Sequence, residues 1–173
     1  PIVAFGKNGA NPHHLNSETR LQHTDIILVD FGAKINGYCA DMTRMIFVGK
    51  PDEKTATQYF ALLSAQQKAL DLLKKGKRKG KLLDTTVRTE MEKNGLPSCP
   101  HSLGHGIGLQ IHEGFRLSYK KDFMMKDNMI CTIEPGFYIE NKLGMRIEDL
   151  VLLKADGIEI LSKSTKEIIF LSS

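Results

Sequence analysis

The chain has 173 residues, which is enough for one domain with a hydrophobic core of its own. Hydrophobic residues make up 41% of it and charged residues 25%, which is ordinary for a globular protein. No apolar run approaches the roughly 20 residues that a membrane span needs, so we expect no membrane partner.

The net charge of +4 is concentrated in one segment. Residues 74–81 carry six positive charges, and the rest of the chain sums to −2. A basic run can contact nucleic acid, but this one has no aromatic residue for stacking and lies between two predicted helices. We interpret it as a solvated loop and expect no nucleic-acid partner.

Three cysteines, Cys39, Cys99 and Cys131, form no Cys-x-x-Cys pair. An odd and sparse set is typical of a reducing compartment rather than of a disulfide framework. We therefore expect a cytoplasmic protein.

The first part of the chain predicts strands at 2–5, 26–31 and 37–48. The alternation along 37–48 is imperfect, which indicates that both faces of that strand are partly covered. Asp30 and Asp41 would lie on neighbouring strands of one hairpin, which residues 33–37 connect.

The middle of the chain predicts two helices, at 52–75 and 81–94. In the first, Tyr59, Leu63, Leu70 and Leu73 recur at helical spacing before Gly76 ends the pattern. The apolar stripes are interpreted as faces that pack on the core.

The last third predicts further strands, at 107–112, 129–133, 136–140, 145–153 and 158–161, with a possible edge strand at 168–171. The order of strands, helices and again strands favours an α+β fold with a mostly antiparallel sheet.

Two acidic hairpins in the sequence look like copies of each other. Each opens with acid-x-Gly and closes with Gly-x-x-x-acid: residues 30–32 and 37–41 form one, and residues 134–136 and 144–148 form the other. Four carboxylates brought to one place repel one another, and some would have to take up protons. Divalent cations relieve this repulsion, so the pattern predicts a carboxylate-rich centre for two metal ions.

Helices and a histidine segment, residues 104–112, precede the second hairpin, whereas one strand and a loop precede the first. If the halves are structural repeats, helical material belongs before Pro1. We therefore expect residues 1–173 to be a catalytic domain that lacks its first helices and any N-terminal domain.

The candidate metal ligands are four carboxylates and one imidazole: Asp30, Asp41, His105, Glu134 and Glu148. Hard oxygen donors with a single nitrogen suit Mn, Co, Fe or Zn. Each acid taken alone could equally be a turn residue or part of a surface ion pair, and only the combination indicates a metal site.

Three further residues stand near these ligands in the sequence. Arg146 shares the strand face of Glu148 and could orient a carboxylate or form a plain surface ion pair, while Asp149 would point to the opposite face. His112 is seven residues from His105, so on a regular strand the two would face opposite ways, and a bulge or bend must intervene if both face one site.

Seven segments resemble the pita-bread metallopeptidase family, which includes methionine aminopeptidases, aminopeptidases P and Xaa-Pro dipeptidases. They are residues 11–13, 29–32, 40–44, 101–108, 111–113, 133–138 and 144–149. They occur in the family's order along nearly the whole chain, and the ending Arg-Ile-Glu-Asp resembles the proline-directed branch.

The resemblance implies a pseudo-twofold, mostly antiparallel sheet covered by helices, and a role for each matching residue. Asp30 would chelate one ion, His105 and Glu134 the other, and Asp41 and Glu148 would bridge the pair. Mn is the ion we expect, with Co, Zn or Fe as alternatives.

The family's remaining site residues also have counterparts here. His13 and His112 would contact the substrate, Glu134 would also move a proton, and Arg146 would support the bridging ligands. One position departs from the pattern: Phe115 stands where the family often has a proline, which would alter a wall of the substrate site.

These observations predict a dinuclear metallopeptidase that hydrolyses Xaa-Pro bonds at the N-terminus of short peptides through a hydroxide shared by two metal ions. We expect a homodimer in the full-length protein. Two alternatives are a catalytically silent pita-bread module that binds peptides or proteins, and another hydrolase on the same fold, such as a creatinase-like amidinohydrolase. Both are disfavoured because all five ligand residues are present.

Overall fold

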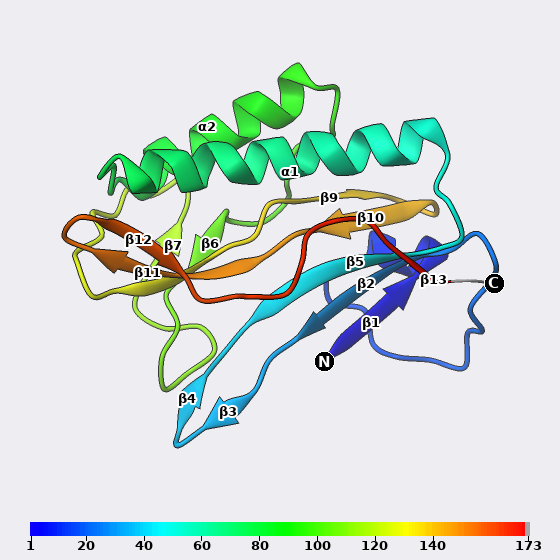
Figure 1. The fold of residues 1–173 in the computed structure, drawn as a ribbon, viewed down its shortest axis with the longest axis horizontal. Coiled ribbons are helices and arrows are strands. Elements are labelled where there is room, and N and C mark those ends of the chain that lie inside the picture. The colour runs from blue at the N-terminus through cyan, green and yellow to red at the C-terminus, as the bar shows by residue number, and fades with distance from the viewer. Residues whose placement is uncertain (172–173) are drawn as a thin grey trace.

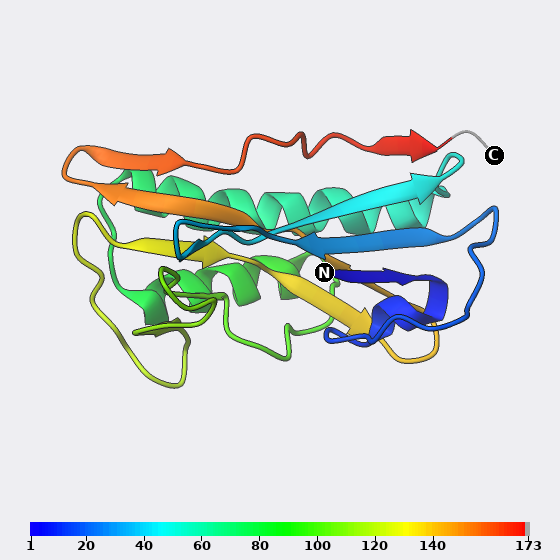
Figure 2. The same ribbon diagram turned by 90° about the horizontal axis from the view of Figure 1, so that it is seen from below.

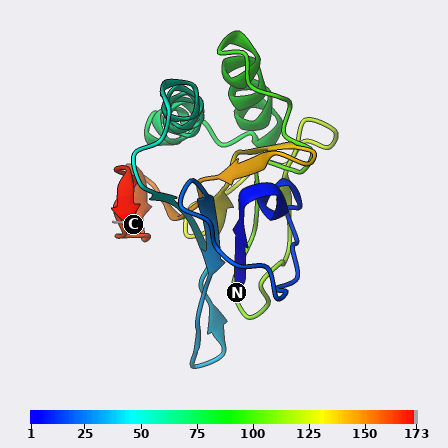
Figure 3. The same ribbon diagram turned by 90° about the vertical axis from the view of Figure 1, so that its right-hand side faces the viewer.

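The computed structural model describes residues 1–171. Two long helices lie on one side of a layer of strands, and a narrow hairpin extends from the opposite edge (Figures 1 and 3). Viewed from below, the strands of the two halves of the chain meet near the middle of the molecule (Figure 2). The observed order of elements is that of an α+β fold, as predicted.

Three strands of the first half of the chain and the C-terminal strand form a four-stranded sheet in the order β1-β2-β5-β13. Its strands are β1 (Ile2–Phe5), β2 (Ile26–Phe31), β5 (Met42–Val48) and β13 (Ile169–Leu171), with a short 3₁₀ turn, η1 (Gly6–Ala10), after β1. All neighbours are antiparallel except β13, which runs parallel to β5. The predicted edge strand at the end of the chain is confirmed.

The strand predicted over 37–48 is wrong in one respect, because it is interrupted at Ala40 and Asp41. The hairpin β3 (Lys34–Ile35) and β4 (Tyr38–Cys39) comes first, and β5 begins only after the break. Two backbone segments approach closely here, since a Cβ on Gly32 would lie 1.8 Å from the carbonyl oxygen of Ala40. The break releases Asp41 from the ladder, in which Thr43, not Asp41, pairs with Asp30.

The two predicted helices are confirmed as α1 (Glu53–Lys74) and α2 (Gly80–Lys93). The Asp52 carboxylate caps α1 by accepting a 2.6 Å hydrogen bond from the Thr55 amide. Gly76 follows α1 with a φ of +74°, a left-handed conformation that glycine adopts without strain. The helices pack against each other and bury their predicted apolar stripes, except that Leu63 is only partly buried.

Seven further strands lie between residues 104 and 160. They are β6 (Gly104–His105), β7 (Arg116–Leu117), β8 (Ile130–Ile133), β9 (Gly136–Ile139), β10 (Leu143–Arg146), β11 (Asp149–Lys154) and β12 (Gly157–Ile160). The predicted strand 145–153 is therefore two strands, separated at Ile147 and Glu148. The amide of Ile147 bonds to Pro135, within its own half, and the next amide, that of Glu148, bonds to Thr43 in the other half. This change of partner ends β10 and begins β11.

The predicted strand 107–112 is wrong: this segment is a loop. Its flanks are held together by bonds from the Gly106 amide to the Phe115 carbonyl and from the Glu113 amide to the Gly106 carbonyl. The loop folds tightly, since a Cβ on Gly108 would lie 2.3 Å from the Glu113 carboxylate. Gly106 and Gly108, which we expected within or beside a strand, instead allow the backbone to pass close to Glu113 in a tight loop.

The core lies between the helices and the strands of both halves. Its largest fully buried side chains include Phe47, Tyr59, Leu70 and Phe137. Neither α-helix in the described part of the chain is apolar enough over a sufficient length to cross a bilayer.

Candidate metal centre

The two acidic hairpins meet at their breaks. The amide of Glu148 donates a 3.2 Å hydrogen bond to the Thr43 carbonyl, which joins the second hairpin to the first. A cleft of about 580 Å³ opens at this junction, and all five candidate ligands line it: Asp30, Asp41, His105, Glu134 and Glu148. The structure thus brings together residues that span more than a hundred positions of sequence.

Three of these residues form a compact cluster. One potential ligand atom from each of Asp41, His105 and Glu148 lies within 4.8 Å of the others. The His105 Nε2 atom lies 3.8 Å from an Asp41 oxygen and 3.4 Å from Glu134 Oε1. Its Nδ1 atom lies 3.1 Å from the Gly106 carbonyl oxygen, which favours the tautomer with a proton on Nδ1 and leaves Nε2 for a cation.

A threonine hydroxyl supports each glutamate. Thr43 Oγ1 donates to Glu148 Oε2 at 2.7 Å, and Thr132 Oγ1 donates to Glu134 Oε1 at 3.1 Å. The Thr132 hydroxyl also accepts from the His105 amide at 3.0 Å. These bonds limit the orientations of three candidate ligands before any ion binds.

The electrostatics of the cleft fit a cation. Burial, with the neighbouring Asp30 charge, raises the pKa of Asp41 to about 7. Burial likewise raises the pKa of Glu134 to about 7 and lifts the pKa of Glu148 well above its ordinary value. Burial lowers the pKa of His105 to about 4, so the ring is neutral and has a lone pair to offer. Acids that ionise reluctantly beside a neutral imidazole are the donor set that a divalent ion stabilises.

Asp30 and Arg146 form an ion pair at the edge of the cluster, with Arg146 Nη2 2.5 Å from Asp30 Oδ2. The same guanidinium donates to Thr43 Oγ1 at 3.1 Å and to the Tyr138 hydroxyl at 2.8 Å. Arg146 is 4% exposed, so it is not the plain surface ion pair considered from the sequence. It connects the two hairpins through side chains.

Sequence reasoning missed two residues of this network, His101 and Tyr138. His101 Nε2 lies 3.0 Å from the Tyr138 hydroxyl, and its ring lines the cleft. Burial lowers the pKa of His101 to about 4. The only sequence signal was the presence of both residues inside motif segments; neither spacing nor charge singled them out.

The structure also places His13 and His112 on the wall of the cleft. The loop at 107–112 provides the bend that the odd spacing required, and it turns the His112 ring edge-on to His105 with centroids 4.3 Å apart. Both His13 and His112 are exposed, as groups that meet a substrate must be.

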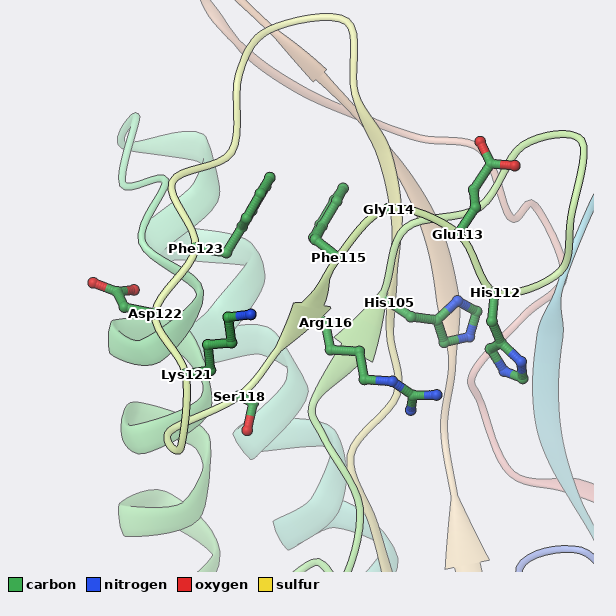
Figure 4. Close-up of a pocket in the computed structure, with 10 residues that line it drawn as sticks. All are labelled: His105, His112, Glu113, Gly114, Phe115, Arg116, Ser118, Lys121, Asp122 and Phe123. Atoms are coloured by element: carbon green, nitrogen blue, oxygen red, sulfur yellow. The ribbon is translucent and has the colours of Figure 1, made fainter.

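A second cavity of about 450 Å³ adjoins the cleft and shares His105, His112 and Arg116 with it. Figure 4 shows Arg116 extending toward the two histidine rings, while Phe115 and Phe123 stand on the far wall. The Phe115 and Phe123 rings stack with their centroids 4.5 Å apart and their planes at 4° to each other. Phe115, the departure from the family pattern, therefore forms part of a cavity wall beside the candidate metal centre.

Comparison with known proteins accords with this geometry. Residues 1–155 match the sequence pattern of metallopeptidase family M24. This chain belongs to metallopeptidase family M24.

Members of the family with similar sequences and structures have been described. The Xaa-Pro dipeptidase of Pyrococcus furiosus is 40% identical over 169 residues, which are 97% of this chain and 48% of that protein. The X-Pro aminopeptidase of Thermotoga maritima, 40% identical, superimposes with a TM-score of 0.92 over 98% of this chain and 48% of its own. A dipeptidase from Mycobacterium ulcerans, 34% identical, superimposes with a TM-score of 0.94 over 99% of this chain and 47% of its own.

The fold is therefore the pita-bread fold of this family. The chain spans about half the length of these relatives.

Proposed function

We propose that the protein containing this chain is a two-metal exopeptidase that hydrolyses Xaa-Pro bonds at the N-terminus of short peptides. The observation that carries the proposal is the convergence of Asp30, Asp41, His105, Glu134 and Glu148 on one cleft. The names of the two relatives at 40% identity support the proline-directed substrate class.

The proposed ligands divide between the two hairpins. Asp30 and Asp41 come from the first, Glu134 and Glu148 from the second, and His105 from the segment between them. Mn²⁺ is the ion we propose, since oxygen donors dominate the set. Two bound ions would supply Lewis acidity and a water of lowered pKa for attack on a peptide carbonyl.

The chain's own groups account for the proton transfers and the binding of the peptide. Glu134 lies in the cleft with its Oε1 atom 3.4 Å from His105 Nε2, and it is assigned to take a proton from the attacking water and to pass it to the departing proline nitrogen. His112 has a lowered pKa because it is partly desolvated, so its neutral ring can donate a hydrogen bond to the carbonyl oxygen under attack. His13 faces the same cleft and is assigned to the substrate.

Arg146 holds ligands of both hairpins in place. It fixes Asp30 and, through Thr43, the carboxylate of Glu148. The guanidinium is buried and donates to four partners, Asp30, Thr43, Tyr138 and the Pro12 carbonyl, so its orientation should change little when a peptide enters.

The decisive experiment measures hydrolysis with added Mn²⁺, Co²⁺ or Zn²⁺, using an Xaa-Pro dipeptide and an Xaa-Pro-Xaa tripeptide. Glu134→Gln should lose at least about 100-fold in kcat, because a positioned general base contributes about that much, and the circular dichroism spectrum should not change. Glu140→Gln, an exposed glutamate at the end of β9, is the matched control. Undiminished turnover by Glu134→Gln would refute the assignment, and hydrolysis that needs no metal would refute the proposed class.

A further inference from the structure

A buried glutamine of α1 lies directly behind the candidate metal centre. Gln66 has an exposed fraction of 0% and is the one amide side chain among the buried polar residues of the described chain. It comes from the helix layer (Figure 1), and it is not among the residues that line the cleft. Burying an amide is costly unless its hydrogen bonds are satisfied, so its partners indicate what it does.

The Gln66 amide nitrogen reaches two backbone carbonyls. Its Nε2 atom donates to the carbonyl of Ile133 at 2.9 Å and to the carbonyl of Ile147 at 3.4 Å. Ile133 directly precedes Glu134, and Ile147 directly precedes Glu148. Each carbonyl shares a rigid peptide plane with the amide of the glutamate that follows it. One side chain therefore holds the two planes that carry both glutamates.

The other end of Gln66 is held as firmly. Its Oε1 atom accepts a 2.9 Å hydrogen bond from Lys166 Nζ, which fixes the direction of the amide and makes Nε2 the group that faces the carbonyls. Lys166 also donates to Asp149 Oδ2 at 2.6 Å. Asp149 is fully buried, and its second oxygen accepts from Arg44 Nη2 at 2.7 Å.

Arg44 extends the same network to the first hairpin. Its Nη1 atom donates to the carbonyl of Thr43 at 2.9 Å and to the carbonyl of Glu148 at 2.5 Å. The hydrogen-bonded series Gln66–Lys166–Asp149–Arg44 thus contacts the backbone of both hairpins on the side away from the cleft. None of its members lines the cleft.

We propose that Gln66 is a positioning residue that sets the separation between Glu134 and Glu148, with Lys166 fixing its orientation. Glu134 lies between β8 and β9, and Glu148 lies between β10 and β11, so neither glutamate belongs to a regular strand. Gln66 bonds to the backbone at both of these positions. The proposal rests on the metal-binding role given to the two glutamates. It adds that the spacing of the site is controlled from α1, by a residue that precedes Glu134 by 68 positions and Glu148 by 82.

The first test is made without metal, on Gln66→Met, which keeps the length of the side chain and removes both hydrogen-bonding groups. The amides of Glu134 and Glu148 are bonded to the carbonyls of Leu103 and Thr43. Hydrogen exchange by mass spectrometry should quicken in peptides that cover 132–135 and 146–149, and should not change in the β1–β2 hairpin. Leu70→Met, a fully buried neighbour on α1, controls for general disturbance of the core.

The second test is Mn²⁺ binding by calorimetry and electron paramagnetic resonance. Residues that orient metal ligands typically change affinity by about 10–100-fold. Gln66→Met should weaken binding within that range and reduce the spin-coupled signal of adjacent Mn²⁺ ions, while Leu70→Met should do neither. The Lys166 side chain is 25% exposed, so Lys166→Met should lower the Mn²⁺ affinity and the spin-coupled signal by less than Gln66→Met does. Lys166→Arg should restore both quantities.

The outcomes separate this inference from the proposed function. Unchanged exchange and unchanged Mn²⁺ affinity in Gln66→Met would overturn the positioning role even if the enzyme is active. Absence of Mn²⁺ binding in the unaltered chain would instead overturn the metal-centre assignment, and with it this inference. If Gln66→Met does not fold, Lys166→Met decides, since unchanged affinity there would also refute the proposal.

Discussion

Replacing Arg146 tests how the two hairpins are held together. Arg146→Met retains the length of the apolar stem and removes the contacts to Asp30, Thr43 and Tyr138. Breaking a buried ion pair by removing one partner costs about 3–5 kcal/mol, because the other charge is left without compensation. Asp30 is 21% exposed and regains some water, so we expect the lower end of this range, about 3 kcal/mol.

The measurement is urea or thermal unfolding of the metal-free protein at pH 7. For a chain of this size, 3 kcal/mol corresponds to a fall in Tm of roughly 6–12 °C. Arg20→Met, which removes an exposed arginine, is the control. Adding Asp30→Asn to Arg146→Met should restore part of the lost stability, since it removes the uncompensated charge.

Two results would refute this reasoning. A change below about 0.5 kcal/mol for Arg146→Met would mean that the guanidinium behaves as a surface group. Strict additivity of the two substitutions would mean that the Asp30–Arg146 contact carries no coupling energy.

Three further outcomes are expected from the same site. First, the free energy of unfolding of the metal-free protein should fall as pH rises through about 6.5 to 8. Burial raises the pKa of Asp41 and Glu134 to about 7 and that of Glu148 further, and acids with raised pKa values lose their stabilising contribution as pH rises through those values. Histidines with lowered pKa values have the opposite effect, because they increase the free energy of unfolding as pH rises between about 4.5 and 6.5. His101, His105 and His112 should therefore offset the acids in that range and keep the free energy of unfolding nearly constant. A continuous rise in the free energy of unfolding from pH 5 to 8 would contradict this. Second, Mn²⁺ at 100 times its Kd should stabilise the protein by about 2.7 kcal/mol and remove most of the alkaline fall, and His105→Ala should abolish this effect in a thermal shift assay. Third, Phe115→Ala should cost about 2 kcal/mol through loss of the stacked pair with Phe123, and in steady-state kinetics it should change KM more than kcat. An unchanged KM would exclude this cavity wall from substrate contact.

Local signals in the sequence were sufficient for the helices and for the identity of the candidate ligands. Asp52 and Gly76 bracket α1 by capping and by a left-handed turn, which are properties of a few neighbouring residues. The paired acid-x-Gly motifs indicated a shared site because repelling carboxylates need a common cation. The histidine segment between the two hairpins indicated His105 as a nitrogen ligand for the same cation.

The interruptions of the strands were decided by tertiary structure. Periodicity predicted unbroken strands through Asp41 and Glu148, yet both acids lie at breaks. The close approach of Ala40 to Gly32 creates one break, and the bond from the Glu148 amide to Thr43 in the other half accompanies the second. Neither contact has a signature in the local alternation of polar and apolar residues.

The sequence by itself determined which groups this protein can offer to a metal ion, since donor chemistry is a property of the side chains. Only the tertiary structure decided how those groups are spaced. His112 reaches His105 through a folded loop, and Gln66 ties the planes before Glu134 and Glu148 together from a distant helix. Such distances depend on contacts between residues far apart in the chain, which no short window of sequence contains.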